Sequence, residues 1–330
     1  MTVPVRFARE GIEVADGLLW LDARKPKPLG VITHAHGDHV GRHQRILCTR
    51  ETATFVRQRS GHNADYTVLA FGEKHTVGDL TVTLHPAGHI LGAAMVHLEG
   101  PRGTLLYSGD FKLTPGLTTP AGQPPHADVL VTEATFGIPA QRLPPSGEVR
   151  EQVLNFVREQ LDAGVTPVLL AYALGKAQEI LALLTEAGLP VAAHGSIWNL
   201  LGPYRAAGLA FPGARRLSRN GARRAAIITP PRWLNSAPVQ ASGRIRVAAI
   251  TGWGNRAVRP GIDVAFPLSD HGDYDELVEL VERVQPKQVH VLHGYAKEFA
   301  ADLQARGFQA DAVPGHSGPE EGEVPGMFAV

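Results

Sequence analysis

The chain has 330 residues, enough for two domains or for one large domain with an insertion, each with its own hydrophobic core. Hydrophobic residues make up 44% and charged residues 19%, and the apolar runs are short, which excludes a membrane-spanning protein. The formal net charge is zero, the N-terminal residues lack the apolar stretch of a secretory signal, and a single cysteine, Cys48, excludes an internal disulfide. These features predict a cytoplasmic protein.

Residues 1–140 are expected to be rich in β-strands, because short apolar runs alternate with Gly and Pro turn signals. The expected strands are residues 18–21, 31–33, 80–84, 94–98, 105–107 and 129–132. The Pro-rich residues 141–147 are typical of a linker.

Helices and strands are expected to alternate after this linker, which predicts a parallel sheet flanked by helices. The expected helices are residues 148–163 and 174–187, and the expected strands are 167–172, 191–193, 225–229 and 244–251. A helix at 274–284, a strand at 288–292 and a helix at 295–305 follow, and residues 315–326 are expected to form a loose segment.

Charge is distributed unevenly along the chain. The 76 residues between Glu186 and Asp263 contain no acidic side chain, although they contain eleven arginines. These are Arg205, Arg215, Arg216, Arg219, Arg223, Arg224, Arg232, Arg244, Arg246, Arg256 and Arg259. Arginine binds phosphate oxygens through its planar guanidinium, and a surface of one sign attracts polyanions. The segment therefore indicates contact with a nucleic-acid backbone, or else a solvated basic face whose arginines pair with acids elsewhere.

Six residues, His34 to His39 (HAHGDH), concentrate three imidazoles and a carboxylate directly after an expected strand. Side chains two positions apart in an extended loop project to the same side, so His34 and His36 can bind one metal ion. Asp38 and His39 can face a second. Imidazole and carboxylate are ligands that Zn²⁺ prefers. The cluster predicts a metal site, against the alternative of a polar loop without metal.

Further ligand candidates follow later strands. His89 stands between glycines in AGHILG, and Asp110 follows a strand in YSGDF. Taken alone, a His or Asp at a strand end is more often a turn or capping residue. A carboxylate in the position of Asp110 can bridge two cations with its two oxygens.

HAHGDH, AGHILG and YSGDF, in this order, resemble the signature of the metallo-β-lactamase superfamily. The stretches VTEAT (131–135), LSDHGD (268–273), VLHG (291–294) and ALGKAQE (173–179) resemble its β-CASP nuclease branch. The resemblance implies an α/β protein: a four-layer αββα metallo-β-lactamase sandwich with an inserted α/β β-CASP cap domain. The sandwich would comprise residues 1–140 and 265–330, and the cap residues 141–264. TEATFG, TGWG and the compact length are most similar to the bacterial DNA-ligase-associated exonucleases, relatives of Artemis.

The resemblance also implies roles for individual residues. The first metal would be held by His34, His36, His89 and Asp110. The second would be held by Asp38, His39, His293 and the bridging Asp110. His271 would protonate the leaving oxygen, and Glu133 would orient His271. Asp22 matches the acid that steadies a ligand imidazole, although a turn residue at a strand end is an equally good interpretation.

These assignments predict a nuclease with two divalent metal ions, zinc or manganese, acting on single-stranded DNA or DNA ends in DNA repair. A DNA ligase or helicase is the expected protein partner, and no membrane is involved. An RNase J-like ribonuclease is the main alternative, because His293 fits the RNA-processing pattern. A thioester or other small-molecule hydrolase and a non-catalytic scaffold are the remaining alternatives.

The expected nucleic-acid contacts rest on weaker signals. They are Lys176, Arg215, Arg216, Arg219, Arg223, Arg224 and Ser269. Gly175 and Lys176 open a helix after a strand, where they can bind a phosphate or simply cap the helix. His194 either lines the cap side of the site or is a structural histidine.

Overall fold

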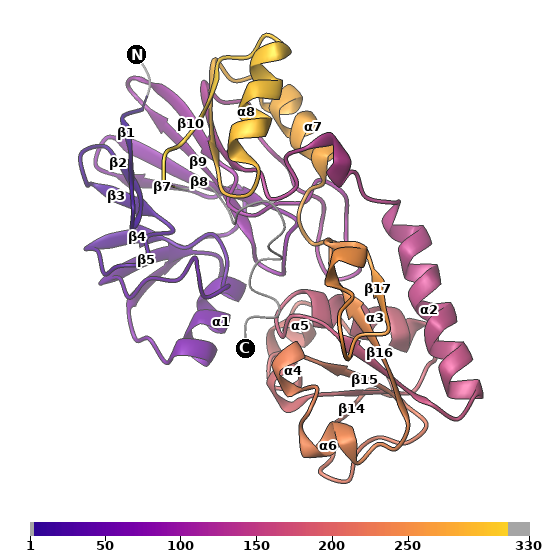
Figure 1. The fold of residues 1–330 in the computed structure, drawn as a ribbon. Coiled ribbons are helices and arrows are strands. Elements are labelled where there is room, and N and C mark those ends of the chain that lie inside the picture. The colour runs from indigo at the N-terminus through magenta and orange to yellow at the C-terminus, as the bar shows by residue number, and fades with distance from the viewer. Residues whose placement is uncertain (1–2, 316–330) are drawn as a thin grey trace. The chain divides into compact units, whose positions relative to one another are not determined.

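The structure, a computed structural model, describes residues 3–315, and these divide into two units. Unit 1 combines residues 3–142 with residues 271–315, and unit 2 consists of residues 143–270. The chain therefore leaves unit 1, forms unit 2 and returns, as the colours of Figure 1 show.

The first sheet of unit 1 contains six strands in chain order. They are β1 (Val5–Ala8), β2 (Gly11–Val14), β3 (Leu19–Leu21), β4 (Leu29–Val31), β5 (Arg45–Cys48) and β6 (Asp65–Val68). The first three pair antiparallel, and β3 to β6 are parallel. Helix α1 (Arg50–Ser60) connects β5 to β6, with Thr49 as its N-cap and Gly61, at φ 62°, as its C-cap.

The second sheet of unit 1 has the strand order β19-β18-β11-β10-β9-β8-β7. The strands are β7 (Lys74–Val77), β8 (Leu80–Pro86), β9 (Ala94–Gly100), β10 (Gly103–Tyr107), β11 (Val129–Glu133), β18 (Gln288–Leu292) and β19 (Ala310–Ala312). Strands β7 to β10 are antiparallel, whereas β10, β11, β18 and β19 run parallel. The carboxyl ends of β10, β11 and β18 therefore lie at one edge of this sheet.

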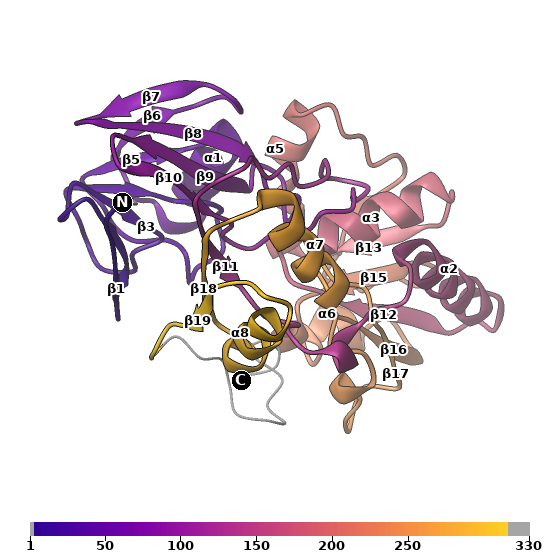
Figure 2. The same ribbon diagram turned by 90° about the horizontal axis from the view of Figure 1, so that it is seen from above.

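The two sheets face each other across a hydrophobic core. Leu19, Leu21 and Val31 of the first sheet belong to the same buried cluster as Leu98 and Val131 of the second. Helix α1 lies beside the first sheet, and α8 (Ala296–Ala305) lies against β18 and β19 (Figures 1 and 2). Helix α7 (Tyr274–Val284) lies beside α8, with an edge-to-face contact between their aromatic rings, so unit 1 is a four-layer αββα sandwich.

Unit 2 is built on a parallel six-stranded sheet of order β14-β13-β15-β12-β16-β17. The strands are β12 (Thr166–Leu170), β13 (Val191–Ala193), β14 (Arg215–Arg216), β15 (Ala226–Thr229), β16 (Ile245–Ile250) and β17 (Val264–Phe266). The helices are α2 (Ser146–Asp162), α3 (Lys176–Glu186), α4 (Gly195–Trp198), α5 (Leu201–Ala206) and α6 (Ala237–Gln240). Short 3₁₀ segments complete the chain: η1 (Pro139–Gln141) in unit 1, and η2 (Pro231–Trp233) and η3 (Gly254–Ala257) in unit 2.

Both faces of the unit 2 sheet are covered. Helices α2 and α3 pack against β12, β13, β15 and β17. The other face forms a buried cluster in which Val168 and Ile227 of the strands meet Val239 of α6 and Ala257 of η3. The alternation of helix and strand thus produces the flanked parallel sheet that the sequence predicts.

The expected strands and long helices are present, and their ends either coincide with the expected ones or differ by at most two residues. Helix α2 begins at Ser146, so the last part of the expected linker is helical, and α1 was not expected at all. The loose segment predicted at 315–326 lies outside the described residues, except for Gly315. Among the residues that the structure describes, none of the helices is long and apolar enough to cross a bilayer.

Candidate metal centre

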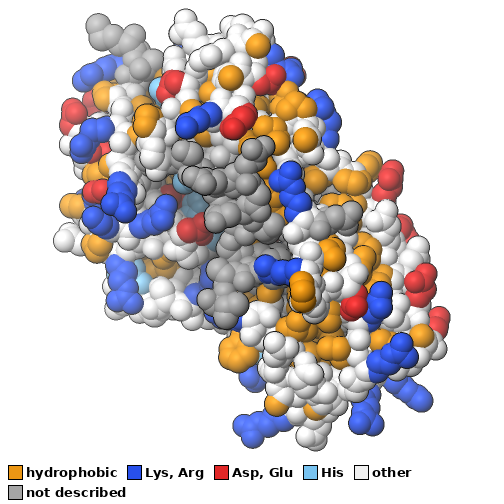
Figure 3. Space-filling model, viewed as in Figure 1, with side chains coloured by type: hydrophobic (Ala, Val, Ile, Leu, Met, Phe, Trp, Pro, Cys, Tyr) orange, Lys and Arg blue, Asp and Glu red, His pale blue; other side chains and the backbone are white. Residues whose placement is uncertain are grey.

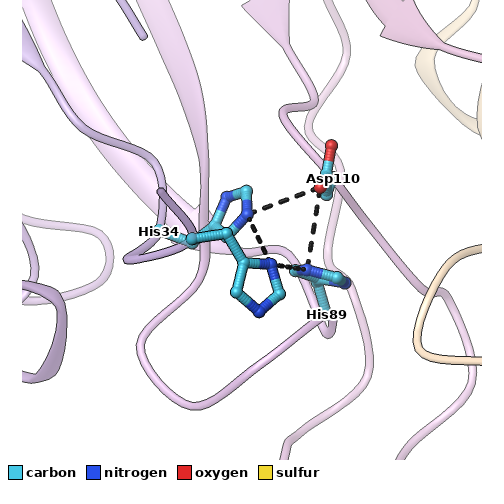
Figure 4. A group of neighbouring side chains, drawn as sticks. His34, His89 and Asp110 are labelled. Carbon is cyan, nitrogen blue, oxygen red and sulfur yellow. Dashed lines mark hydrogen bonds and ion pairs between the residues drawn. The ribbon is translucent and has the colours of Figure 1, made fainter. Parts of the chain in front are cut away.

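Four predicted ligands converge in unit 1. His34 Nε2 lies 3.2 Å from His36 Nδ1, which in turn lies 3.0 Å from His89 Nε2. Asp110 Oδ2 lies 3.4 Å from His34 Nε2 and 3.7 Å from His89 Nε2 (Figure 4). One donor atom from each residue lies within 4.8 Å of the others, so the four side chains point toward a common centre.

The sheets bring these residues together from three separate segments. His34 and His36 follow β4, His89 lies between β8 and β9, and Asp110 follows β10. Gly109 lets the Asp110 loop approach the His34 loop, because its φ is 52° and a Cβ atom there would lie 2.9 Å from Thr33 Oγ1. A larger residue at position 109 would push the two loops apart.

The electrostatics of the centre suit a cation. Burial lowers the pKa of His34 well below the usual range of histidine, so its imidazole is neutral and can bind a metal ion. Burial alone would raise the pKa of the Asp110 carboxyl, but His39, His271 and His34 together hold it well below its usual range. Neutral imidazoles and an ionised carboxylate are the donors of a zinc site, so the residues fit a bound divalent metal.

Asp110 also lies close to a second group of side chains that can bind a metal ion. His39 Nε2 lies 3.4 Å from Asp110 Oδ2 and 3.8 Å from Asp38 Oδ2. Burial would lower the pKa of His39, but the carboxylates of Asp110 and Asp22 raise it well above its usual range. Asp38 is exposed, whereas His39 is buried. Asp110 thus lies beside both groups of donors.

Asp22 is buried and surrounded by hydrogen-bond donors. Its Oδ2 accepts from Thr33 Oγ1 at 2.7 Å and from Tyr107 OH at 3.0 Å, and lies 2.8 Å from His39 Nδ1. Its Oδ1 accepts from the Thr33 amide at 2.8 Å. A carboxylate held in this way fixes the orientation of the His39 ring.

Glu133 and His271 form a second carboxylate–imidazole pair. His271 Nδ1 lies 2.9 Å from Oε1 and 3.0 Å from Oε2 of Glu133. Glu133 is buried at the end of β11 and also accepts from the Phe111 amide at 3.1 Å and from the Thr135 hydroxyl. The His271 ring lies 4.6 Å from that of His89, so this pair borders the ligand cluster.

His293 lies at the end of β18, next to the end of β11 that carries Glu133, and its φ of 57° is left-handed. The next residue, Gly294, packs so closely on Ala134 that a Cβ atom would lie 2.2 Å from its carbonyl oxygen. Among the described residues, His293 is not part of the four-ligand group. Its place in a second metal site therefore stays a prediction.

Four supporting residues were not identified from the sequence. Thr33 and Tyr107 hydrogen-bond to Asp22, and both adjoin the metal motifs, which could have drawn attention to them. Lys112 and Glu276 form a buried ion pair of 3.1 Å between segments 164 residues apart. Such a distant pairing leaves no local pattern in a single sequence.

The expected nucleic-acid contacts belong to unit 2 and differ in exposure. Lys176 is buried and pairs with Asp270 at 3.2 Å, and Ser269 is also buried. Five predicted arginines are exposed: Arg215, Arg216, Arg219, Arg223 and Arg224. Figure 3 shows Lys and Arg side chains protruding from unit 2 toward the end that carries β14 and α6.

A family model and several curated proteins are similar to parts of the chain. The model of the Zn-dependent metallo-hydrolase RNA specificity domain (RMMBL) matches residues 258–314. The chain is 42% identical over 302 residues to a probable DNA ligase of Opitutus terrae, covering 89% of this chain and 29% of that protein. It is 30% identical over 211 residues to the transcription termination factor FttA of Methanocaldococcus jannaschii, covering 51% of this chain and 33% of the relative.

A shorter match links the chain to the endoribonuclease ysh1 of Emericella nidulans, with 36% identity over 124 residues, 36% of this chain and 14% of that protein. The chain thus spans a third or less of the length of these curated relatives. A crystal structure of a protein of unknown function from Enterococcus faecalis V583 has a TM-score of 0.55 at 12% identity. That alignment covers 89% of this chain and 80% of the other, and it shows a shared fold alone.

Proposed function

Because the chain belongs to the β-CASP branch of the metallo-β-lactamase superfamily, we propose that it is a metal-dependent nuclease that hydrolyses phosphodiester bonds. The observation that carries the proposal is the convergence of His34, His36, His89 and Asp110 on one centre. Three imidazoles and a carboxylate suit a borderline divalent cation, zinc or manganese.

Two cations would be held by the residues of unit 1. His34, His36, His89 and Asp110 would hold the first, and Asp38, His39, His293 and Asp110 would hold the second. When bound, such cations lower the pKa of water and neutralise charge on phosphate oxygens. Asp22 contributes by keeping the Nδ1 side of His39 occupied, so that Nε2 faces Asp110.

His271 is the proposed general acid. Glu133 binds its Nδ1, which directs the opposite nitrogen, Nε2, toward the leaving oxygen. An alkoxide is a poor leaving group, so a positioned proton donor accelerates cleavage by roughly 10²–10⁴-fold. The buried carboxylate of Glu133 also stabilises the protonated imidazole.

DNA is the proposed substrate, with exonucleolytic removal of nucleotides from single strands or ends during repair in the cytoplasm. The similarity that covers most of the chain, 42% identity to a protein named a probable DNA ligase, supports this choice and suggests a ligase or helicase as partner. The exposed arginines of unit 2 offer guanidinium groups for the phosphate backbone.

RNA is the second candidate substrate. The RNA specificity domain matches residues 258–314, which include both His271 and His293. A named endoribonuclease and a transcription termination factor are among the relatives. An RNase J-like activity would use the same metal ligands and the same acid.

The purified chain, supplied with zinc or manganese, can be assayed on 5′-labelled single-stranded DNA and on RNA of matched sequence. We expect Asp110→Ala to lose bound metal and all cleavage. We expect His271→Ala to retain metal but to cleave roughly 10²–10⁴-fold more slowly. Asp79→Ala, at an exposed turn between β7 and β8, is the matched control and should resemble the wild type in both measurements.

Three results would overturn parts of the proposal. Degradation of RNA with intact DNA would reject the DNA substrate in favour of the ribonuclease. A metal-loaded wild type that cleaves neither polymer would reject the nuclease itself, and turnover of a thioester would then identify a small-molecule hydrolase. A fully active His271→Ala would remove the acid role from this residue.

A further inference from the structure

An exposed tryptophan stands at the carboxyl edge of the unit 2 sheet. Trp233 ends η2, directly after β15, and 41% of its surface is exposed. Its amide donates to Pro230 O at 2.9 Å, which fixes the turn that presents the ring. A tryptophan combines a large flat ring with a polar N–H and is enriched where proteins contact their partners, so Trp233 is a candidate contact residue.

Trp233 is stacked on His194. The two ring centroids lie 5.1 Å apart and the ring planes differ by 22°. His194 follows β13, the parallel neighbour of β15, so both residues lie at the same edge of the sheet. In open parallel sheets, this edge is where ligands commonly bind.

The imidazole of His194 is an uncharged platform. Its Nδ1 accepts from the Ser196 amide at 3.2 Å and lies 2.9 Å from the Ser196 hydroxyl. Burial, followed by Arg232 and Arg216, lowers the pKa of His194, so the ring is neutral at pH 7. The ring therefore supports Trp233 without adding charge.

Two guanidinium groups flank this aromatic pair. Arg232 Cζ lies 5.9 Å from the centre of the Trp233 ring. Arg216, in β14, lies against Gly195, with Nη2 3.1 Å from the position that a Cβ atom would take there. Both arginines are exposed, and this part of the sequence has no acidic residue between Glu186 and Asp263. An anionic ligand is the natural complement.

We propose that Trp233, His194, Arg216 and Arg232 form a subsite for one unpaired nucleotide of a single-stranded nucleic acid. The base stacks on Trp233, and the adjoining phosphates contact the two guanidinium groups. A nucleotide offers both a flat aromatic base and a negative charge, whereas a duplex keeps its bases inside. The subsite deepens the proposed nuclease function, on which it rests for its natural ligand, although binding can be measured without cleavage.

The test uses the whole chain in EDTA, where no cleavage occurs, and labelled oligo(dT) followed by fluorescence anisotropy. An oligomer of the same length with abasic sites offers the phosphates without the bases, and oligo(rU) tests the sugar. We expect Trp233→Ala to weaken binding of oligo(dT) by roughly 5- to 100-fold while leaving the abasic oligomer unaffected.

The arginines should behave differently. Arg216→Ala and Arg232→Ala should weaken both oligomers alike, and each should lower the slope of log affinity against log salt by about 0.7. Arg158→Ala is the matched control, because Arg158 is exposed in α2 of unit 2 but lies outside the acid-free segment. Phe71→Ala, in unit 1 and also 41% exposed, is the aromatic control. Both controls should bind like the wild type.

The stacking subsite would be overturned if wild type and Trp233→Ala bound oligo(dT) with equal affinity. It would also be overturned if Trp233→Ala lost as much affinity for the abasic oligomer as for oligo(dT). Absence of any oligonucleotide binding by the wild type would do the same. A chain that binds through Trp233 but cleaves no nucleic acid when loaded with metal would instead leave the subsite in place and reject the nuclease.

Discussion

Asp22 forms hydrogen bonds to three residues beside the metal centre. Its two oxygens contact the amide and hydroxyl of Thr33, the hydroxyl of Tyr107 and the ring of His39. The same network joins β3, the loop that carries His34, and β10, because Asp22 follows β3, Thr33 precedes His34 and Tyr107 ends β10. Asp22 therefore organises the ligand loop and one ligand together.

Asp22→Asn should reduce the affinity of the protein for divalent metal by roughly 10- to 100-fold, because the amide cannot accept from all of these donors. Competition with a chromophoric chelator measures this affinity directly. Asp16→Asn is a suitable control, since Asp16 is exposed and shares a positive φ with Asp22. Unchanged metal affinity in Asp22→Asn would reduce Asp22 to a turn residue, the alternative that the sequence also allowed.

Residues close to a motif could be identified from the sequence, whereas residues joined only by folding could not. His34 and His36 stand two positions apart, and their spacing alone indicates a shared ion. The contacts of His89 and Asp110 with them were expected only from the family resemblance, and the geometry brings all four together. The pairing of Lys112 with Glu276 depends on how α7 returns to unit 1, which no local pattern reports.

Helix α7 is attached to the loop after β10 through its first turn. Asp273 caps the helix by accepting from the amides of Asp275 and Glu276. Glu276 Oε1 accepts from the Thr114 amide at 2.8 Å, and its Oε2 pairs with Lys112 at 3.1 Å. Lys112 Nζ also donates to the backbone carbonyl of His271 at 3.5 Å. The helix terminus thus holds the segment that carries the proposed acid.

Removal of this ion pair should displace His271 and slow cleavage. The double variant Lys112→Met/Glu276→Gln leaves no unpaired buried charge, so it should fold, unlike either single neutral variant. We expect a loss of roughly 10-fold or more on an ordinary phosphodiester. A p-nitrophenyl phosphodiester, whose leaving group needs no proton, should be cleaved at nearly the wild-type rate.

The control for that variant is Lys74→Met/Glu99→Gln, which removes an exposed ion pair between β7 and β9 in the same unit. This control should cleave both substrates at the wild-type rate. If Lys112→Met/Glu276→Gln kept its metal but cleaved both substrates equally slowly, the ion pair would have a general structural role and would not position the acid.

Elements with a clear apolar pattern were predictable from the sequence, and elements with few apolar side chains were not. Helix α7 buries Leu277, Leu280, Val281 and Val284, a spacing that only a helix explains. Helix α1 buries only four of its eleven residues, so its apolar signal is weak. Strand β14 consists of two arginines and β19 of Ala-Asp-Ala, so neither contains an apolar run, and only their pairing with neighbouring strands defines them.

For the whole molecule, several histidines link stability to pH. Burial lowers the pKa of His43, His85, His97 and His194 in the folded chain. The unfolded chain therefore binds more protons than the folded chain once the pH falls below about 6.5. His39 shifts the other way, and its effect on stability lies above that pH.

The free energy of unfolding in EDTA should therefore fall as the pH is lowered from about 6.5 to 5.5. Urea titrations at several pH values measure the trend. His85→Gln/His97→Gln should show a shallower dependence, because two of the histidines with a lowered pKa are gone. A free energy of unfolding that stays constant or rises over this range would contradict the expectation.

Because unit 2 is inserted between the two parts of unit 1, the ribosome completes unit 2 before it makes the last part of unit 1. The four converging ligands lie before residue 111, whereas His271 and His293 are translated only after all of unit 2. A nascent chain that stops within residues 143–270 contains His34, His36, His89 and Asp110 but lacks His271, the proposed proton donor. It also lacks β18 and β19, so β11 would become an open sheet edge prone to aggregation. Truncated chains of this kind should therefore lack the proposed nuclease activity and be poorly stable.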